Sequence, residues 1–285
     1  FGEVWTQFQW NTNMNKIDIS YASKTEHNFA QRILIKTIER ITGKRKLQKI
    51  YNEFSKNNSN PRYFWTGILK SMNINIIDNS ESGIRIPAKG PLIMIANHPF
   101  GIIDGLIMCS LASKVRSDFK ILTHETLQFV PEVGKYILPI DFSENKKETV
   151  KNNIKTTQEA RRHLLNNGLL IIFPSGSVSV AKDSKSVAED DEWKQFTAKI
   201  LKQTKSDILP IYFDGKNGLL FHVFASKLKN QTLKYSSYIH ETKKMIGKEI
   251  NIYPGNVIKY SDLSKISNRE KLTEYLKKKT YELRK

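Results

Sequence analysis

His98 and Asp104 stand six residues apart inside one of the most apolar stretches of the chain, "IMIANHPFGIIDGLIM", residues 93–108. An ionisable side chain in such a stretch is costly unless it is paired or used. A histidine within reach of a carboxylate can act as a general base, because the carboxylate fixes the imidazole tautomer and stabilises the imidazolium. The spacing alone leaves two interpretations open: a catalytic base, or a histidine held for structure at the end of a strand.

The residues around this pair favour the catalytic interpretation. Asn97 precedes the histidine, Pro99 and Gly101 are typical of a turn, and Gly105 follows the aspartate directly. The stretch holds no serine or cysteine in an activating motif, and the chain has no Gly-x-Ser-x-Gly nucleophile elbow. Direct attack by a substrate hydroxyl that His98 deprotonates is therefore the simpler interpretation, and before any resemblance is considered the structural role of the histidine stays open.

The elements that must position these residues alternate between strands and helices from about residue 73. Short apolar runs predict strands near residues 73–77, 91–97, 118–123, 136–141, 168–174, 207–213 and 249–255. Helical periodicity falls between them, at residues 104–114, 147–166, 193–205 and 218–229. This alternation predicts an α/β fold with a mixed, partly parallel sheet flanked by helices.

The ends of the chain predict additional helices. Residues 1–72 form a helical N-terminal region with amphipathic pieces at 28–42, 47–54 and 61–69, and residues 73–285 form the main domain. The piece at 28–42 has two possible roles, packing against the sheet or contacting a membrane. Residues 268–285 predict a charged surface helix, and we assign no function to residues 1–13.

Composition narrows the class of protein. The chain has 285 residues with 39% hydrophobic and 26% charged residues, which is typical of a folded globular protein. A single cysteine excludes an intramolecular disulfide framework and favours a reducing compartment. No apolar run is long enough to predict a spanning helix. The net charge of +18 favours a polyanionic partner: a nucleic acid, an anionic membrane surface or an acidic protein.

Two strand ends carry polar loops. "ANHPFGIIDG" follows the strand at 92–96, and "FPSGSVS" follows the strand at 169–173. In open sheets of this kind, ligands collect where strands end and loops begin, because side chains and free backbone amides converge there. We therefore expect these two loops to form the functional site.

The two loops, in this order and followed by "DILPIYFDG", resemble the motifs of the lysophospholipid acyltransferase superfamily. Members of that superfamily carry an Asn-His-x(4)-Asp motif and a later Phe-Pro-Glu-Gly-Thr-Arg-Ser motif. The likeness is greater to the bacterial hemolysin-like, lyso-aminolipid branch, whose first motif has the spacing His98 and Asp104 show here. It covers roughly residues 73–258.

The resemblance implies an acyltransferase mechanism and a set of site residues. His98 would take the proton of an acceptor hydroxyl that attacks an acyl thioester, and Asp104 would orient the imidazole. The two loops would bind substrate, and their predicted binding residues are Asn97, Pro99, Phe100, Gly101, Phe173, Pro174, Ser175, Gly176, Ser177 and Ser179. The resemblance implies no cofactor and no metal, and the six histidines show no metal-ligand spacing.

Two departures of the second motif from the family pattern bear on the acceptor. Ser175 occupies the usual Glu position and Val178 the usual Arg position, and valine cannot make the two-pronged contact with a phosphate that a guanidinium makes. A lyso-aminolipid such as an N-acylated amino acid is therefore favoured over lysophosphatidic acid as acceptor. The serines at 175, 177 and 179 could bond the head group or satisfy the turn's own backbone.

The remaining expectations concern partners and location. The acyl donor is acyl-CoA or acyl carrier protein, which is acidic. The basic charge suits a peripheral protein on the cytoplasmic face of an inner membrane. Two rivals remain: a nucleic-acid-binding protein, against which the chain shows no helix-turn-helix, zinc-finger or RNP signature, and a thioesterase or lipid hydrolase using water at the same pair.

Overall fold

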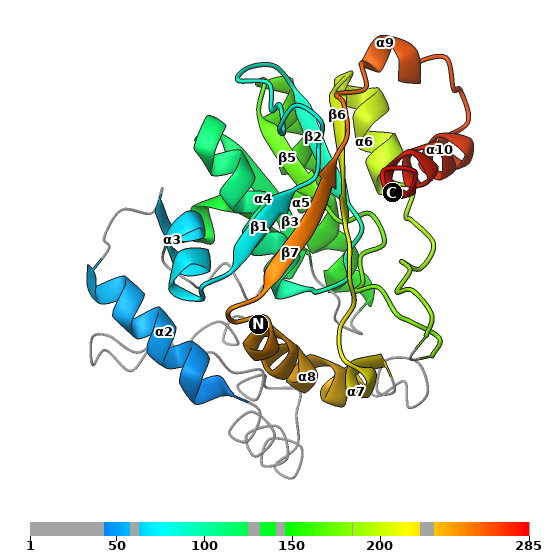
Figure 1. The fold of residues 1–285 in the computed structure, drawn as a ribbon. Helices are drawn as coiled ribbons and strands as arrows, with labels where there is room; N and C mark the ends of the chain where they lie inside the picture. The colour runs from blue at the N-terminus through cyan, green and yellow to red at the C-terminus, as the bar shows by residue number, and fades with distance from the viewer. Residues whose placement is uncertain are drawn as a thin grey trace.

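The computed structural model describes residues 43–57, 63–124, 132–140, 146–183, 185–222 and 231–284. Figure 1 shows a sheet with helices packed on both sides of it. The strands are β1 (Asn75–Asp78), β2 (Leu92–Ala96), β3 (Phe119–His124), β4 (Ile137–Ile140), β5 (Leu169–Ile172), β6 (Asp207–Phe213) and β7 (Glu249–Pro254). The helices are α2 (Lys44–Asn57), α3 (Phe64–Ser71), α4 (Ile102–Val115), the 3₁₀ turn η4 (Gly134–Tyr136), α5 (Lys146–Leu165), α6 (Phe196–Thr204), α7 (Leu219–His222), α8 (Gln231–Lys244), α9 (Tyr260–Leu263) and α10 (Arg269–Tyr281).

Among the described residues, seven strands form one sheet in the order β1-β7-β6-β2-β5-β3-β4. Neighbouring strands are parallel except for β6 and β7, which pair antiparallel. The mixed α/β sheet predicted from the alternation of strands and helices is confirmed, and it is mostly parallel. Helical crossovers between parallel strands require helices on both faces of the sheet.

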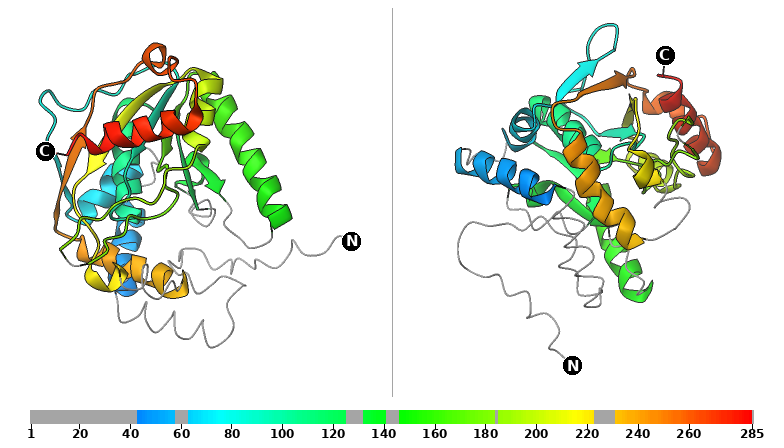
Figure 2. Two further views of the ribbon diagram at one scale, coloured as in Figure 1. Left: turned by 90° about the vertical axis from the view of Figure 1, so that its right-hand side faces the viewer. Right: turned by 60° about the horizontal axis from the view of Figure 1, so that its bottom comes forward.

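The central strand β2 shows how the sequence divides the core into two layers. All five of its residues are buried, and successive side chains point to opposite faces of the sheet. Met94 and Ala96 join the apolar cluster that contains α2, α3 and α4, whereas Ile93 and Ile95 join the cluster that contains α5, α6 and α10. The left view of Figure 2 shows α5 and α10 on the same side of the sheet. A strand with both faces covered reads as a continuous apolar run, which is what residues 92–96 show.

The helices before the sheet belong to the same core. Leu47 and Phe54 of α2 and Phe64 and Trp65 of α3 are buried in the cluster that contains Met94. Edge-to-face contacts at 5.6 Å between the Phe54 and Phe64 rings and at 6.0 Å between Trp65 and Phe119 continue this packing to β3. The helices predicted near 47–54 and 61–69 are therefore present and pack on the sheet.

Several expectations differ from the structure or fall outside it. The predicted helix at 28–42 lies outside the described residues, and of the helix predicted at 218–229 only Leu219–His222 is described. Helix α8 had no counterpart among the predicted helices. The C-terminal helix α10 is charged as expected, but it is more than a surface helix, because Leu272, Leu276 and Thr280 at four-residue spacing form a buried stripe.

Candidate active site

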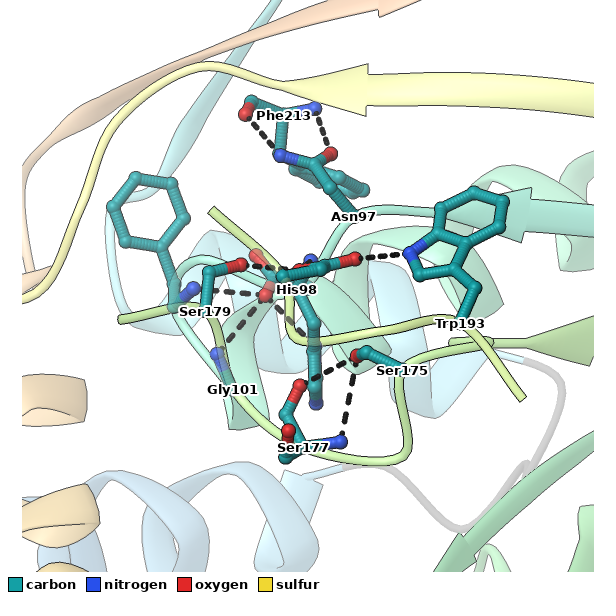
Figure 3. A network of polar contacts seen from close by, with 11 residues as sticks. Asn97, His98, Gly101, Ser175, Ser177, Ser179, Trp193 and Phe213 are labelled. Atoms are coloured by element: carbon teal, nitrogen blue, oxygen red, sulfur yellow. Dashed lines mark hydrogen bonds and ion pairs between the residues drawn. The ribbon is translucent and has the colours of Figure 1, made fainter. Parts of the chain in front are cut away.

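The two loops singled out from the sequence meet at one edge of the sheet. Strands β2 and β5 are parallel neighbours with Ile95 opposite Ile172, so both chains leave the sheet at the same end. The first loop brings His98 over Phe173 of the second, with ring centroids 4.0 Å apart and an interplanar angle of 23°. The two loops therefore converge, and Figure 3 shows His98 with Gly101 of the first loop and Ser175, Ser177 and Ser179 of the second around it.

His98 and Asp104 form a hydrogen-bonded pair. Nδ1 of the imidazole lies 3.0 Å from Asp104 Oδ2, and 17% of the histidine side chain is exposed whereas none of the carboxylate is. A carboxylate can only accept here, so the neutral imidazole carries its proton on Nδ1 and leaves the Nε2 lone pair available. Among the described residues, no hydrogen bond reaches Nε2. The pair therefore has the geometry of a general base with its basic atom open to a ligand.

Asp104 is held by the start of helix α4. Gly101, with φ 76°, turns the chain into the helix, and Oδ2 accepts hydrogen bonds from the backbone N–H groups of Phe100 at 2.8 Å and Gly101 at 2.9 Å. The helix N-terminus favours a negative charge at this position. Burial raises the pKa of the Asp104 carboxyl, and its hydrogen bonds act in the opposite direction. Oδ2 is thus the common acceptor for two backbone donors and the imidazole.

Asn97 does not face the open side of the site. Its side chain is buried, its Nδ2 donates to Phe213 O at 2.9 Å, and its Oδ1 accepts from Phe213 N at 2.7 Å. These two bonds tie the end of β2 to the end of β6, as Figure 3 shows. We therefore describe Asn97 as a residue that anchors the loop rather than one that contacts a ligand.

The hydroxyl groups of the three serines of the second loop donate hydrogen bonds to other groups of the protein. Ser175 Oγ donates to Ser177 O at 2.7 Å, Ser177 Oγ donates to Asp191 Oδ2 at 3.1 Å, and Ser179 Oγ donates to Asp190 Oδ1 at 2.5 Å. Of the two roles left open for the serines, Ser175 satisfies its own turn, because it and the exposed Gly176, with φ 70°, shape the loop tip. Ser177, half-buried, is the most open of the three.

The other predicted binding residues divide into open and covered ones. Phe173 is half-buried beside His98, while Pro99, Phe100 and Pro174 are buried. A Cβ atom at Gly215 would lie 2.3 Å from the Phe100 ring, so Phe100 packs against the loop after β6. Phe100 and the two prolines are covered residues of the loops, and Phe173 is the apolar side chain that stacks on His98.

Val178 is covered in this fold. It is 4% exposed, and a Cβ atom at Gly101 would lie 3.2 Å from Val178 Cγ2 and 3.3 Å from the Tyr238 ring of α8. The position where the family pattern has arginine thus holds a buried valine beside Gly101 of the first loop, and the Tyr238 ring of α8 lies beside the same glycine.

One residue of the site had no signal in the sequence analysis. Asp190 is 5% exposed and lies between β5 and α6, and its carboxylate contacts both loops. Its Oδ1 accepts from the His98 backbone N–H at 3.1 Å and from Ser179, and its Oδ2 accepts from Trp193 Nε1 at 2.8 Å. Burial raises the pKa of the Asp190 carboxyl. A pairing over 92 residues has no local pattern that could reveal it.

The described residues contain no group of three or more His, Cys, Asp or Glu side chains that could hold a metal ion. None of the helices in the described part of the chain combines the length and apolar character needed to cross a membrane.

Comparison with known proteins assigns the chain to a family. A family model described as an acyltransferase matches residues 17–285, nearly the whole chain. The chain belongs to this acyltransferase family. The resemblance seen in the two loop motifs is confirmed, and so is the prediction that the protein is an acyltransferase.

The acyltransferase is also similar to individual proteins. It is 24% identical over 205 residues to the lyso-glycine lipid O-acyltransferase of Bacteroides thetaiotaomicron, covering 70% of this chain and 72% of that protein. It is 22% identical to the lyso-glycine lipid O-acyltransferase of Phocaeicola vulgatus, with 70% of each chain covered. Among solved structures, the 1-acyl-sn-glycerophosphate (LPA) acyltransferase PlsC from Thermotoga maritima aligns with a TM-score of 0.47 and 15% identity, covering 89% of this chain and 79% of that one.

Proposed function

We propose that this acyltransferase moves a fatty acyl group from an acyl thioester to the hydroxyl of a lyso-lipid, with His98 as general base. The observation that carries the proposal is the His98–Asp104 pair, in which a buried carboxylate holds the proton on Nδ1 and the Nε2 side stays open. The family assignment and the similarity to two lyso-glycine lipid O-acyltransferases support the reaction type.

In the proposed reaction, Nε2 of His98 takes the proton of the acceptor hydroxyl as its oxygen forms the new ester bond to the thioester carbonyl carbon. The carbon–sulfur bond breaks, and the imidazolium returns the proton to the leaving thiolate. Asp104 stabilises the imidazolium between these two steps. This chemistry consumes one thioester and one hydroxyl and releases one ester and one thiol, and it needs no cofactor.

The acceptor is proposed to be a lyso-aminolipid rather than lysophosphatidic acid. The relatives act on lyso-glycine lipid, an aminolipid, as their names state. Val178 is a buried apolar residue where the family pattern has arginine, so the loop offers no guanidinium to a phosphate. Charged hydrogen bonds are worth about 1.5–3 kcal/mol each, so their absence costs lysophosphatidic acid one to two orders of magnitude in kcat/KM.

The test compares kcat/KM for lyso-glycine lipid and for lysophosphatidic acid with the same acyl donor. The comparison is made once with acyl-CoA as donor and once with acylated acyl carrier protein. We expect lyso-glycine lipid to be the better acceptor, and thiol release to depend on the acceptor. Thiol release that needs no acceptor identifies a hydrolase instead. A tenfold or greater preference for lysophosphatidic acid rejects the aminolipid assignment.

The enzyme is further proposed to work at the surface of an anionic membrane, on the cytoplasmic face of the inner membrane. Arg45, Lys46 and Lys49 of α2 are exposed, and each basic residue near such a surface contributes about 1 kcal/mol. Leu219 and Leu220 of α7 are 56% and 58% exposed, and Figure 1 shows α2, α7 and α8 together at the lower end of the molecule. Basic and apolar side chains exposed together suit interfacial binding.

A further inference from the structure

The buried carboxylate of Asp190 is a second acidic group at the base, and the mechanism above does not use it. It accepts three hydrogen bonds, from the backbone N–H of His98, the hydroxyl of Ser179 and the indole N–H of Trp193. Among the described residues, no lysine or arginine forms an ion pair with this carboxylate. Lys277 Nζ lies nearby but bonds the backbone carbonyl of Asp190, at 3.0 Å. A buried carboxylate held only by hydrogen bonds is costly to maintain.

Asp190 and Ser179 together bind both polar backbone atoms of His98. The N–H of His98 donates to Asp190 Oδ1 at 3.1 Å, and the C=O of His98 accepts from the N–H of Ser179 at 2.8 Å. Ser179 in turn donates its hydroxyl to the same Asp190 oxygen. Both polar backbone atoms of His98 are therefore bound to the second loop or to the carboxylate that holds it.

Asp190 is itself fixed by the C-terminal helix. Its backbone N–H donates to Tyr281 Oη at 2.8 Å, and Lys277 Nζ bonds its carbonyl, both from α10. The buried stripe of α10 anchors that helix to the core. The position of Asp190 is thus set by the core of the protein rather than by the loop that contains it.

We propose that Asp190 is a positioning residue that sets the place of His98 and its distance from the second loop. Asp104 orients the imidazole ring, and Asp190 holds the backbone that carries the ring. This inference rests on the proposed role of His98 as the base. A displacement of a catalytic group by about 1 Å can cost about 100-fold in rate, so fixing the backbone of the base has a measurable effect.

The test measures kcat and KM for thiol release with an acyl-CoA and lyso-glycine lipid in the wild-type enzyme and in Asp190→Ala, Asp190→Asn and Glu192→Gln. Asp190→Ala removes the acceptor and should lower kcat about 10- to 100-fold, with KM for the thioester changed less than about twofold. Asn keeps one oxygen for His98 and Ser179 but turns its NH₂ group toward the indole N–H of Trp193, so Asp190→Asn should recover only part of that loss. Glu192 is an exposed neighbouring carboxylate, and Glu192→Gln should behave as wild type.

A double-mutant cycle with His98→Ala separates positioning from general stabilisation. If Asp190 acts through His98, Asp190→Ala has little further effect on kcat once His98 is alanine. A full additional loss in that background, a rise in KM with unchanged kcat, or wild-type kinetics of Asp190→Ala each overturns the proposal.

Loss of native circular dichroism in both Asp190 variants assigns the residue to folding alone and also overturns it. An inactive wild-type enzyme would instead reject the proposed acceptor and donor, which keeps the two failures distinct.

Discussion

Replacement of Asp104 by asparagine tests how the carboxylate supports the base. Oδ2 accepts from Phe100 N at 2.8 Å, Gly101 N at 2.9 Å and His98 Nδ1 at 3.0 Å. In Asp104→Asn the carbonyl oxygen of the amide must take the Oδ2 place, because an NH₂ group there would face two backbone donors. The same oxygen then accepts from His98 Nδ1, so the tautomer with a free Nε2 is kept. What the variant loses is the negative charge.

The size of the loss follows from that difference. A hydrogen bond to a charged group contributes about 1.5–3 kcal/mol and a neutral one about 0.5–1.5 kcal/mol, so the charge is worth about 1–1.5 kcal/mol to the imidazolium. This corresponds to a fall in kcat of about 5- to 13-fold. His98→Ala removes the base and should lower kcat by about 10²- to 10⁴-fold. Asparagine should therefore be clearly the milder change.

The assay is steady-state thiol release from an acyl-CoA with saturating lyso-glycine lipid, with the thermal midpoint of each variant measured alongside. Asp104→Ala is unsuitable for the comparison, because it leaves three donors without their acceptor at a fully buried position. An Asp104→Asn enzyme as damaged as His98→Ala would show that the tautomer is lost, and the argument from the two backbone donors would be wrong. An undamaged one would show that the charge has no part in the rate.

Three further predictions concern stability and the membrane. Asn97→Ala leaves the buried N–H and C=O of Phe213 unpaired and should lower the free energy of unfolding by about 1–3 kcal/mol for each group, measured in urea; an unchanged midpoint would contradict the anchoring role. Burial and the Glu132 carboxylate raise the pKa of Tyr51 to about 12 from its ordinary value of 10.0, so between those pH values the folded state keeps a proton that the unfolded state releases, and stability falls as pH rises. The urea midpoint of the wild type should therefore drop more steeply above pH 10 than that of Tyr51→Phe, and parallel curves would argue against the shift. Binding to anionic vesicles should weaken steeply with salt and be poor on neutral vesicles, and flotation that shows equal binding to both at all salt concentrations would reject the anionic-surface proposal.

Much of the site was predictable because its central contact is local. His98 and Asp104 lie in one turn and the first turn of the helix that follows it, so a spacing of six residues with Gly101 between them is enough to bring the side chains together. The alternation of apolar strands with helices predicted a largely parallel sheet, and parallel neighbours bring the two loops to one edge. These features depend on periodicity and chain direction, which a sequence displays directly.

The remaining features depend on which strands and helices become neighbours, and no local pattern encodes that. Asp190 reaches the His98 backbone over 92 residues, and Asn97 reaches Phe213 over 116 residues, because β5 and β6 flank β2 in the sheet. Gly101 lies beside both Val178 of the second loop and Tyr238 of α8, a helix that the periodicity did not predict. The sequence by itself determined the fold class and the pairing of His98 with Asp104. Only the tertiary structure decided what holds that pair in place, because long-range hydrogen bonds form between groups that the strand order brings together.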